Sequence, residues 1–362
     1  MESPYFVLVM KRMLLSLAAL VAALSLQAAP VCPETESIDT LRSAVVTGTR
    51  VAMERDRLPA PVSVIGRSRI ESSDESALMT SLMEEVPGLF VTSRGVTGYG
   101  VSSGAAGGIS LRGFSAASGR TLVLIDGHPQ YMSIYGHAVA DEYLADLAER
   151  VEVTRGAASV LYGSNAMGGA INIITRQPNF LGNRVNFKVM GGSYGTWRGT
   201  VTDQYSNGRF GLTANFGYDR TAGHRDNSAF RSMSGMLKAS YDLSAAWRLS
   251  GDVNLVKAYS ENPGTVERPM FEGTADILRM MSWLSLENHY ERTDGGVNIY
   301  YNAGRHEIND GYAAGGKPQP FLFHSTDYQG GLNVFQAFQP WTGGTLTGGV
   351  DVKLYGGNAY RN

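Results

Sequence analysis

The sequence predicts an α+β domain followed by an antiparallel transmembrane β-barrel, and three observations lead to this prediction. From about residue 183, apolar and polar residues alternate with period two, as in strands that have one face in lipid and the other in water. The links between these strands alternate between tight turns and long loops. Charged residues make up 18% of the chain, and 44 of its 362 residues are glycine, which fits a β-rich membrane protein better than a helical enzyme.

Composition excludes several classes of function. Lys and Arg total 31 and Asp and Glu total 33, so the net charge of -2 leaves no extended basic surface for nucleic acid. The one cysteine, Cys32, excludes an internal disulfide and a cysteine-based zinc cluster. The six histidines have no clustered carboxylates beside them, so we expect neither a metal site nor a cofactor.

Residues 1–29 have the pattern of a secretory signal peptide. Lys11 and Arg12 precede an uncharged run over 13–26, and small residues follow that run. The run is shorter than the roughly 18–20 residues that a membrane-spanning helix needs, which disfavours an anchor. Residues 30–50 are polar and rich in Ser and Thr, and they predict a flexible segment.

Residues 51–180 predict the small α+β domain. Ser72 and Glu75 match a capping box, which predicts that a helix begins there, and one apolar helical face follows, made by Leu78, Met79 and Leu82. The other elements expected here are strands at 61–65 and 121–125, a turn at Asp126 and Gly127, a helix at 143–150, a strand at 151–153, a short helix at 157–162 and a strand at 170–174.

Residues 181–362 predict about nine strands of the barrel. Tight turns are expected at Asn207-Gly208 and Asp294-Gly295, and long loops at 260–275 and 308–325. Aromatic residues gather near the predicted strand ends, as in an interfacial girdle: Tyr194, Trp197, Tyr205, Tyr218, Tyr241 and Trp247. The alternative is a soluble β-sandwich, which the long strands and the asymmetry of the links disfavour.

No motif in the chain indicates catalysis. Residues 191–195 match the G-x-S-x-G pattern of hydrolases, but they join two alternating strands rather than a strand and a helix, so we expect a hairpin. The glycines of 95–108 do not follow the dinucleotide-binding fingerprint, and they predict a mobile loop. We find no acid, base or nucleophile arrangement, and we predict that the protein is not an enzyme.

Several segments together carry a family resemblance. In order they are 45–50 (VVTGTR), 82–89 (LMEEVPGL), 109–114 (ISLRGF), 123–127 (VLIDG), 151–156 (VEVTRG) and 158–176 (ASVLYGSNAMGGAINIITR). Each is weak alone, but the ordered set followed by the strand repeat resembles the plug domain and first barrel strands of TonB-dependent outer-membrane receptors. The resemblance is closest to the cobalamin, haem and siderophore receptors. It implies a Gram-negative outer-membrane protein for active uptake of an iron chelate, haem or cobalamin.

The resemblance also implies a partner, TonB, which pairs with an extended receptor segment by adding a strand. The candidate residues in the flexible segment are Asp39, Thr40, Leu41, Val45, Val46 and Thr47. The family's contiguous acidic-Thr-Leu-Val-Val-Thr pattern is interrupted here by 42–44. The alternative, which the sequence leaves open, is that 45–49 form the first plug strand.

Two further sets of site residues follow from the resemblance. The candidates for ligand binding, on the apical loops of the plug, are Tyr99, His128, Tyr131, Tyr135 and His137, whose rings suit a flat or chelated ligand. The alternative is that these side chains pack against the barrel wall or face solvent. The candidates for contacts between plug and barrel are Arg112, Arg155 and Arg176.

The chain departs from the family in length. Family barrels have about 22 strands around a plugged lumen, and an open barrel edge would leave unpaired backbone groups in lipid. We therefore expect the amino-terminal part of a longer receptor. The remaining alternatives are an outer-membrane ligand-binding or adhesion protein without transport, and a soluble α+β module followed by a β-sandwich.

Overall fold

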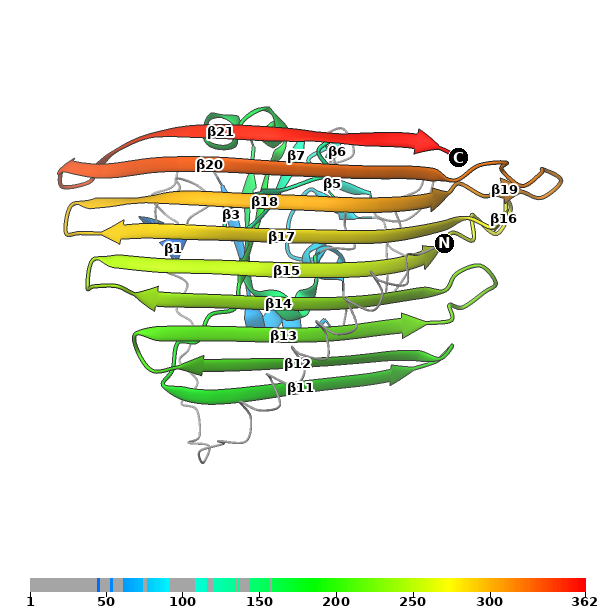
Figure 1. The fold of residues 1–362 in the computed structure, drawn as a ribbon, viewed down its shortest axis with the longest axis horizontal. Helices are drawn as coiled ribbons and strands as arrows, with labels where there is room; N and C mark the ends of the chain where they lie inside the picture. The colour runs from blue at the N-terminus through cyan, green and yellow to red at the C-terminus, as the bar shows by residue number, and fades with distance from the viewer. Residues whose placement is uncertain are drawn as a thin grey trace.

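The computed structural model of the chain describes residues 44–45, 53–54, 61–73, 77–91, 108–115, 120–134, 136, 138, 143–156 and 158–362. The chain has a nine-stranded sheet, and Figure 1 shows its long strands side by side with a smaller group of elements packed behind them. We call the nine-stranded sheet the wall, and the smaller group, with the described elements of residues 61–176, the plug.

The plug is built on a five-stranded sheet in the order β3-β9-β10-β7-β8. β10 runs parallel to β7, and the other neighbours are antiparallel. The strands are β3 (Val62–Gly66), β7 (Thr121–Ile125), β8 (His128–Gln130), β9 (Ala148–Arg155) and β10 (Gly169–Thr175). A three-stranded sheet joins β4 (Leu89–Val91), β5 (Ile109–Leu111) and β6 (Phe114–Ser115), and β1 (Ala44–Val45) pairs with β2 (Met53–Glu54).

Short helices cover the plug sheet: α2 (Arg67–Glu71), α3 (Leu78–Leu82), α4 (Ser159–Tyr162) and the 3-10 helices η4 (Ala145–Leu147) and η5 (Ser164–Ala166). Because both faces of the sheet are covered, its central strands carry consecutive apolar residues rather than an alternating pattern. Leu111, Leu124 and Ile171 are fully buried in the resulting interior. Across the described ranges, no helix is long and apolar enough to cross a membrane.

The structure corrects two predictions in the plug. Ser72 caps no following helix, because it ends α2, and its hydroxyl donates a hydrogen bond of 2.8 Å to the Arg69 carbonyl. α3 begins after Ala77 without any side-chain cap. The helix expected over 143–150 is also wrong: a single 3-10 turn precedes β9, whose pairing with β10 draws the backbone into a strand already at Ala148.

The wall is one antiparallel sheet in chain order, which confirms the predicted nine strands. They are β11 (Gly182–Gly192), β12 (Thr196–Ser206), β13 (Phe210–Thr221), β14 (Phe230–Asp242), β15 (Trp247–Glu261), β17 (Thr274–His289), β18 (Thr293–Asn309), β20 (Phe323–Trp341) and β21 (Gly344–Arg361). β11 and β21 are its edge strands, so the sheet is an open part of a barrel. The strands run from 11 to 19 residues, so each is at least as long as the ~9–11 residues that cross a bilayer.

The two ends of the wall differ in their connections. At one end the strands are joined by the short segments 207–209, 243–246, 290–292 and 342–343, and at the other the connections lengthen from 193–195 to 222–229, 262–273 and 310–322. Two of the long connections pair through β16 (Met270–Phe271) and β19 (Tyr312–Ala313), on the right in Figure 1. Short turns mark the periplasmic end of a bacterial barrel, so the long connections are extracellular.

The structure confirms the predicted hairpin at 191–195 and corrects the turn predicted at Asp294-Gly295. Residues 191–195 form a hairpin, and Tyr194 and Gly195 have φ of 59° and 63°, which suits a tight turn between antiparallel strands. Asp294 and Gly295, in contrast, lie inside β18, and the turn falls earlier, at 290–292. A Cβ at Gly295 would come within 2.6 Å of the Phe335 carbonyl, so this glycine serves close strand approach rather than a turn.

Candidate functional site at the contact between plug and wall

One hairpin of the plug reaches the inner face of the wall. Asp126 and Gly127 join β7 to β8 with φ of 48° and 81°, the two positive values of a type I′ turn. Asp and Gly are among the residues that tolerate this conformation, so the local sequence fixes the hairpin. The hairpin and the residues after it, up to Ile134, provide most of the polar contacts described below.

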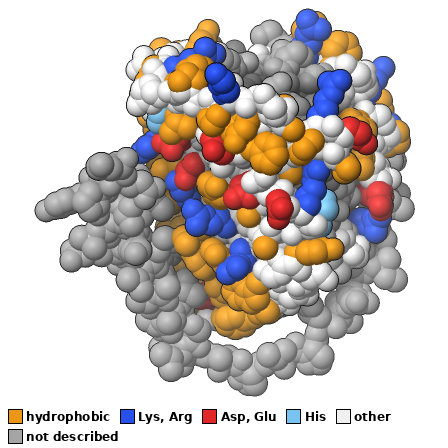
Figure 2. All heavy atoms as spheres, turned by 90° about the vertical axis from the view of Figure 1, so that its right-hand side faces the viewer, with side chains coloured by type: hydrophobic (Ala, Val, Ile, Leu, Met, Phe, Trp, Pro, Cys, Tyr) orange, Lys and Arg blue, Asp and Glu red, His pale blue; other side chains and the backbone are white. Residues whose placement is uncertain are grey.

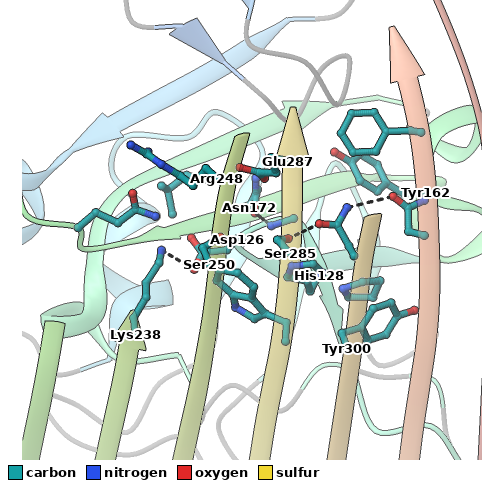
Figure 3. A pocket seen from close by; sticks show the side chains of 18 of the residues that line it. Asp126, His128, Tyr162, Asn172, Lys238, Arg248, Ser250, Ser285, Glu287 and Tyr300 are labelled. Carbon is teal, nitrogen blue, oxygen red and sulfur yellow. Dashed lines mark hydrogen bonds and ion pairs between the residues drawn. The ribbon is translucent and has the colours of Figure 1, made fainter. Parts of the chain in front are cut away.

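The first contact is an ion pair at the turn of this hairpin. The Asp126 carboxylate accepts hydrogen bonds from the Thr175 amide (2.9 Å), the Thr175 hydroxyl (2.6 Å) and the ammonium of Lys238 on β14 (2.9 Å). Burial raises the pKa of Asp126, but Lys238 and the bonds from Thr175 outweigh it, so the pKa lies below its usual range. The carboxylate is therefore charged and paired at neutral pH. Figure 3 shows Lys238 reaching towards it.

A second contact joins η4 to the wall. Arg198 on β12, only 1% exposed, forms ion pairs with Asp146 of the plug and, at 3.3 Å, with Asp219 on the neighbouring strand β13. A buried guanidinium needs such partners because its desolvation is costly. The plug thus supplies one of the two carboxylates that stabilise Arg198.

A third contact centres on Asp327 of β20. Its carboxylate accepts hydrogen bonds from the Ser133 amide (2.9 Å) and from Arg279 of β17 (2.5 Å). The Ser133 hydroxyl also donates to the Gly356 carbonyl at 3.0 Å, and Arg279 donates to the Tyr131 carbonyl at 3.4 Å. Charged and polar groups of the wall therefore hold the plug chain at Tyr131 and at Ser133.

A cavity of about 240 Å³ lies beside the hairpin, between the plug and the wall strands. Its lining combines polar and apolar side chains in similar measure, and the polar ones include Asp126, Asn172, Lys238, Ser250, Ser285 and Glu287 (Figure 3). These polar groups can hold water molecules, each bonding to several of them. Water can thus replace protein partners at this contact more easily than in an apolar interior.

Two of the predicted ligand-binding residues lie in this contact. The ring of His128, 6% exposed, lies 5.1 Å from that of Trp283 and 5.7 Å from that of Tyr300. The Tyr131 hydroxyl accepts a hydrogen bond of 2.9 Å from Gln329, and burial raises the pKa of Tyr131. Both residues thus face the wall, which was the alternative the sequence left open. The other three, Tyr99, Tyr135 and His137, lie outside the described residues.

The predicted plug–barrel arginines are found in the plug, and their described contacts are local. Arg176 pairs with Glu71 at 3.1 Å, and burial lowers its pKa from its ordinary value. The Arg155 amide donates to the Pro61 carbonyl at 3.0 Å, and the Arg112 amide donates to the Gly88 carbonyl at 2.7 Å. Their contact with the wall stays a prediction, whereas Asp126, Asp146 and Ser133 make contacts that the structure describes.

Sequence reasoning missed Asp126, Asp146, Lys238, Arg198, Arg279 and Asp327 as a set. One signal was present: Lys238, Arg198 and Arg279 are charged residues at positions that alternate with lipid-facing ones, so they had to face the interior. Their partners Asp126, Asp146 and Asp327 lie between 48 and 112 residues away in the chain, and nothing local specifies them.

The candidate TonB-interacting residues are mostly outside the described residues. Val45 is described as part of β1, where its backbone pairs with Met53. Asp39, Thr40, Leu41, Val46 and Thr47 are not described. The role of Val45 in binding TonB stays a prediction. Across the described ranges, no group of three or more His, Cys, Asp or Glu residues is arranged to hold a metal ion.

An open barrel wall, an inner plug and charged contacts between them define a plugged outer-membrane barrel protein. The model of the TonB-dependent receptor plug domain matches residues 54–170, and the predicted resemblance is thereby confirmed: the chain carries the plug and wall fold of a TonB-dependent receptor. This fold and the plug match indicate the outer membrane of a Gram-negative bacterium.

Solved structures share the fold at low sequence identity. The FpvA–pyoverdine complex of Pseudomonas aeruginosa matches with a TM-score of 0.72 at 16% identity, over 90% of this chain and 47% of that one. The ferric yersiniabactin uptake receptor FyuA from Yersinia pestis gives 0.67 at 16% identity, over 84% and 50%. The copper transporter OprC gives 0.68 at 16% identity, over 83% and 47%. The chain thus spans about half the length of the structures it matches.

Proposed function

We propose that this chain provides the plug and part of the wall of a receptor that takes up a metal chelate across the outer membrane with energy from TonB. The observation that carries the proposal is the way in which the plug is seated. Its hairpin meets the wall through a buried ion pair, Asp126 with Lys238, beside a cavity whose lining includes several polar groups. Such a contact closes the lumen at rest and can be exchanged for water when the plug moves.

The polar contacts between plug and wall favour a plug that is displaced with an input of energy over one that blocks the lumen permanently. Arg198 and Lys238 are 1% and 3% exposed, so removing the plug carboxylates that pair with them, Asp146 and Asp126, costs free energy, and the plug does not leave spontaneously. The energy must therefore come from outside the receptor. In the family that the plug resembles, TonB supplies it by pulling on an extended segment at the amino end of the receptor.

We propose that the pulled segment lies within 39–47 and includes Asp39, Thr40, Leu41, Val45, Val46 and Thr47. Strand addition needs a row of backbone N–H and C=O groups, with alternate side chains read by the partner. Val45 and Val46 are β-branched, which suits an extended chain. β1 pairs only with Met53–Glu54 among the described strands, so its pairing is short.

We propose a ferric chelate as the ligand class, with haem and cobalamin as the next candidates. The support is the ligands of two fold relatives, pyoverdine for FpvA and ferric yersiniabactin for FyuA. Tyr99, Tyr135 and His137 are the proposed apical contacts. His128 and Tyr131 can join them only after the plug has shifted, since the wall now covers His128.

The proposed division of the chain is a signal peptide at 1–29, a TonB-interacting segment at 30–50, the plug at 51–180 and the first part of the barrel at 181–362. We propose binding and transport without catalysis. The fold relatives that support this are an uptake receptor, FyuA, and a copper transporter, OprC.

The test is uptake by cells that express the full-length receptor and lack their own receptors for the ligands offered. Labelled ferric siderophores, haem and cobalamin are supplied separately. We expect energy-dependent uptake of one of them, and none in cells without TonB. Surface binding that persists without uptake would instead indicate a binding or adhesion protein.

The variant Val46→Pro tests the pulled segment. Proline has no N–H to donate and resists strand pairing, so we expect uptake to fall at least tenfold while ligand binding is unchanged. Val46→Ile is the matched control, because it keeps the N–H and the β-branched side chain. Normal uptake by Val46→Pro would place the TonB segment elsewhere.

A further inference from the structure

Two arginines face each other on the outer surface of the wall. Arg220 on β13 lies directly opposite Arg231 on β14 in the strand register. Their chain neighbours Asp219 and Ser232 are buried on the plug side, with 4% and 2% exposure. Because side chains alternate along a strand, both arginines point outward, and both are exposed.

The pair lies at the height of the extracellular membrane interface. Trp197 is the register neighbour of Arg220 and Tyr259 that of Arg231, so aromatic rings flank both arginines. On β14, Arg231 is ten residues from the outward-facing Tyr241, near the short turns. Ten residues on a strand tilted by 35–45° rise roughly 23–27 Å along the membrane normal, close to the ~25 Å apolar band of such barrels.

Between these two heights the outer face of β13 and β14 is apolar. On β13 and β14 the outward positions are Leu212, Ala214, Phe216, Tyr218, Met233, Gly235, Leu237 and Ala239. The arginines therefore stand where the hydrocarbon ends and lipid headgroups begin. Figure 2 views this end of the molecule, where basic, acidic and apolar side chains are interspersed over the described surface.

The outward carboxylates nearby have other partners. Asp276 pairs with Lys257, Glu307 lies 3.7 Å from Arg305, and Glu261 accepts a hydrogen bond of 3.0 Å from the Ala229 amide. Within the described part of the chain, neither Arg220 nor Arg231 pairs with a carboxylate. The described ring contact is that of Arg231 with Tyr259, at 4.8 Å from the ring centre.

Like charges directly opposite each other on a sheet are destabilising, so an anion between them would relieve repulsion. We propose that Arg220 and Arg231 bind the phosphate of a phosphorylated lipid headgroup in the outer leaflet. The two guanidinium groups match the geometry of phosphate, which accepts paired N–H bonds. The acyl chains of the same lipid would lie along the apolar positions below, next to Tyr218 and Met233. This site is independent of the proposed transport function.

The test is a binding titration of the full-length receptor, purified in detergent, with lipid A carrying two phosphates. Native mass spectrometry counts the bound lipid. A basic residue near an anionic lipid surface contributes about fivefold in affinity, so the double variant Arg220→Gln with Arg231→Gln should bind about 30-fold more weakly. Arg305→Gln is the matched control: it lies on the same face, already has an acidic neighbour and should change affinity less than about twofold.

Two measurements on the unaltered receptor complete the test. Lipid A without phosphates should bind at least about tenfold more weakly than the phosphorylated form, and inorganic phosphate should not compete at equal concentration. The proposal is overturned if the double variant, shown to be folded by its heat-dependent gel migration, retains full affinity. It is also overturned if inorganic phosphate binds as tightly as the lipid, or if phosphate-free lipid binds equally well. Ligand uptake should be unchanged in the double variant, so failure here leaves the transport proposal untouched.

Discussion

Inside the plug, Leu111 and Ile171 lie among other apolar side chains, whereas at the wall Asp126 and Asp146 meet Lys238 and Arg198. The first region is a cluster of apolar side chains that excludes water. The second is buried but polar, and a cavity adjoins it. The difference indicates that the plug folds around its own core and is then attached by contacts that water can replace.

The contrast is not complete, because the wall also contributes apolar contacts. Met281, Trp283 and Tyr300 belong to the same buried cluster as the plug interior. These three side chains pack the plug against β17 and β18, and the ion pairs determine its position along the wall. The following predictions separate the two kinds of contact, in order of decreasing effect.

The largest effect is expected from breaking the plug interior. Leu111 is fully buried and packs against Gly169, so Leu111→Ala leaves a cavity and should lower the free energy of unfolding of the plug by about 2–5 kcal/mol. Denaturant unfolding of the full-length protein, followed by a label in the plug, measures it. Leu181→Ala, at a residue 76% exposed, is the control and should have no such effect.

A smaller effect is expected from breaking the attachment. Lys238→Met leaves the Asp126 carboxylate buried without its ammonium partner, but its two bonds from Thr175 remain, so the cost is about 1–3 kcal/mol. Proteoliposome swelling should show increased passage of small solutes. Lys257→Met removes a lysine whose partner Asp276 lies on the outer face, and it should leave permeability unchanged.

Adding Asp126→Asn to Lys238→Met sharpens this result. The second change removes the unpaired charge, so part of the lost attachment should return. Permeability of the double variant should lie between those of Lys238→Met and the unaltered receptor. A double variant more permeable than either single one would mean that the ion pair does not hold the plug.

The attachment should also weaken in acid. The pKa of Asp126 is lower in the folded protein than its usual value near 3.9, so folding favours the charged form. This contribution is complete above pH 4–5 and is lost as the pH falls through the lowered folded pKa. Swelling assays between pH 7 and pH 3 should show permeability rising only below about pH 4, and Asp126→Asn should reduce that rise.

The smallest effect is expected away from both regions. Tyr290 accepts a hydrogen bond of 2.9 Å from Trp247 at the short-turn rim of the wall, where Tyr290 is exposed and Trp247 is half-buried. Tyr290→Phe should lower wall stability by about 0.5–1 kcal/mol and leave the plug unchanged. A change in solute permeability would show that the rim and the plug are coupled.

Much of this architecture could be predicted from the sequence. The period-two pattern predicted the nine wall strands, because lipid on one face and polar groups on the other impose that alternation. The Asp126-Gly127 turn was predicted because few residues tolerate two positive φ values. The failures arose where a distant partner overrode local preference: β9 begins at Ala148 through its pairing with β10, and Asp294-Gly295 lies within a strand.

The candidate site was predicted less well. His128 and Tyr131 were singled out, but their contact with Trp283 and Gln329 could be foreseen only as one alternative. The ion pairs were missed altogether, because the sequence around a plug carboxylate does not indicate which wall residue it contacts. Register and alternation locate an inward lysine such as Lys238, whereas its partner depends on how the plug sits.

The most direct test is amide hydrogen exchange in the full-length receptor, comparing Lys238→Met and Leu111→Ala with the unaltered protein. If the plug has its own core and a separable attachment, Lys238→Met should speed exchange in the hairpin and the segment after it, residues 121–134, and leave α3 and β5 protected. Leu111→Ala should speed exchange in α3 and β5. Equal loss of protection across the whole plug in Lys238→Met would contradict the account, because core and attachment would then be a single unit.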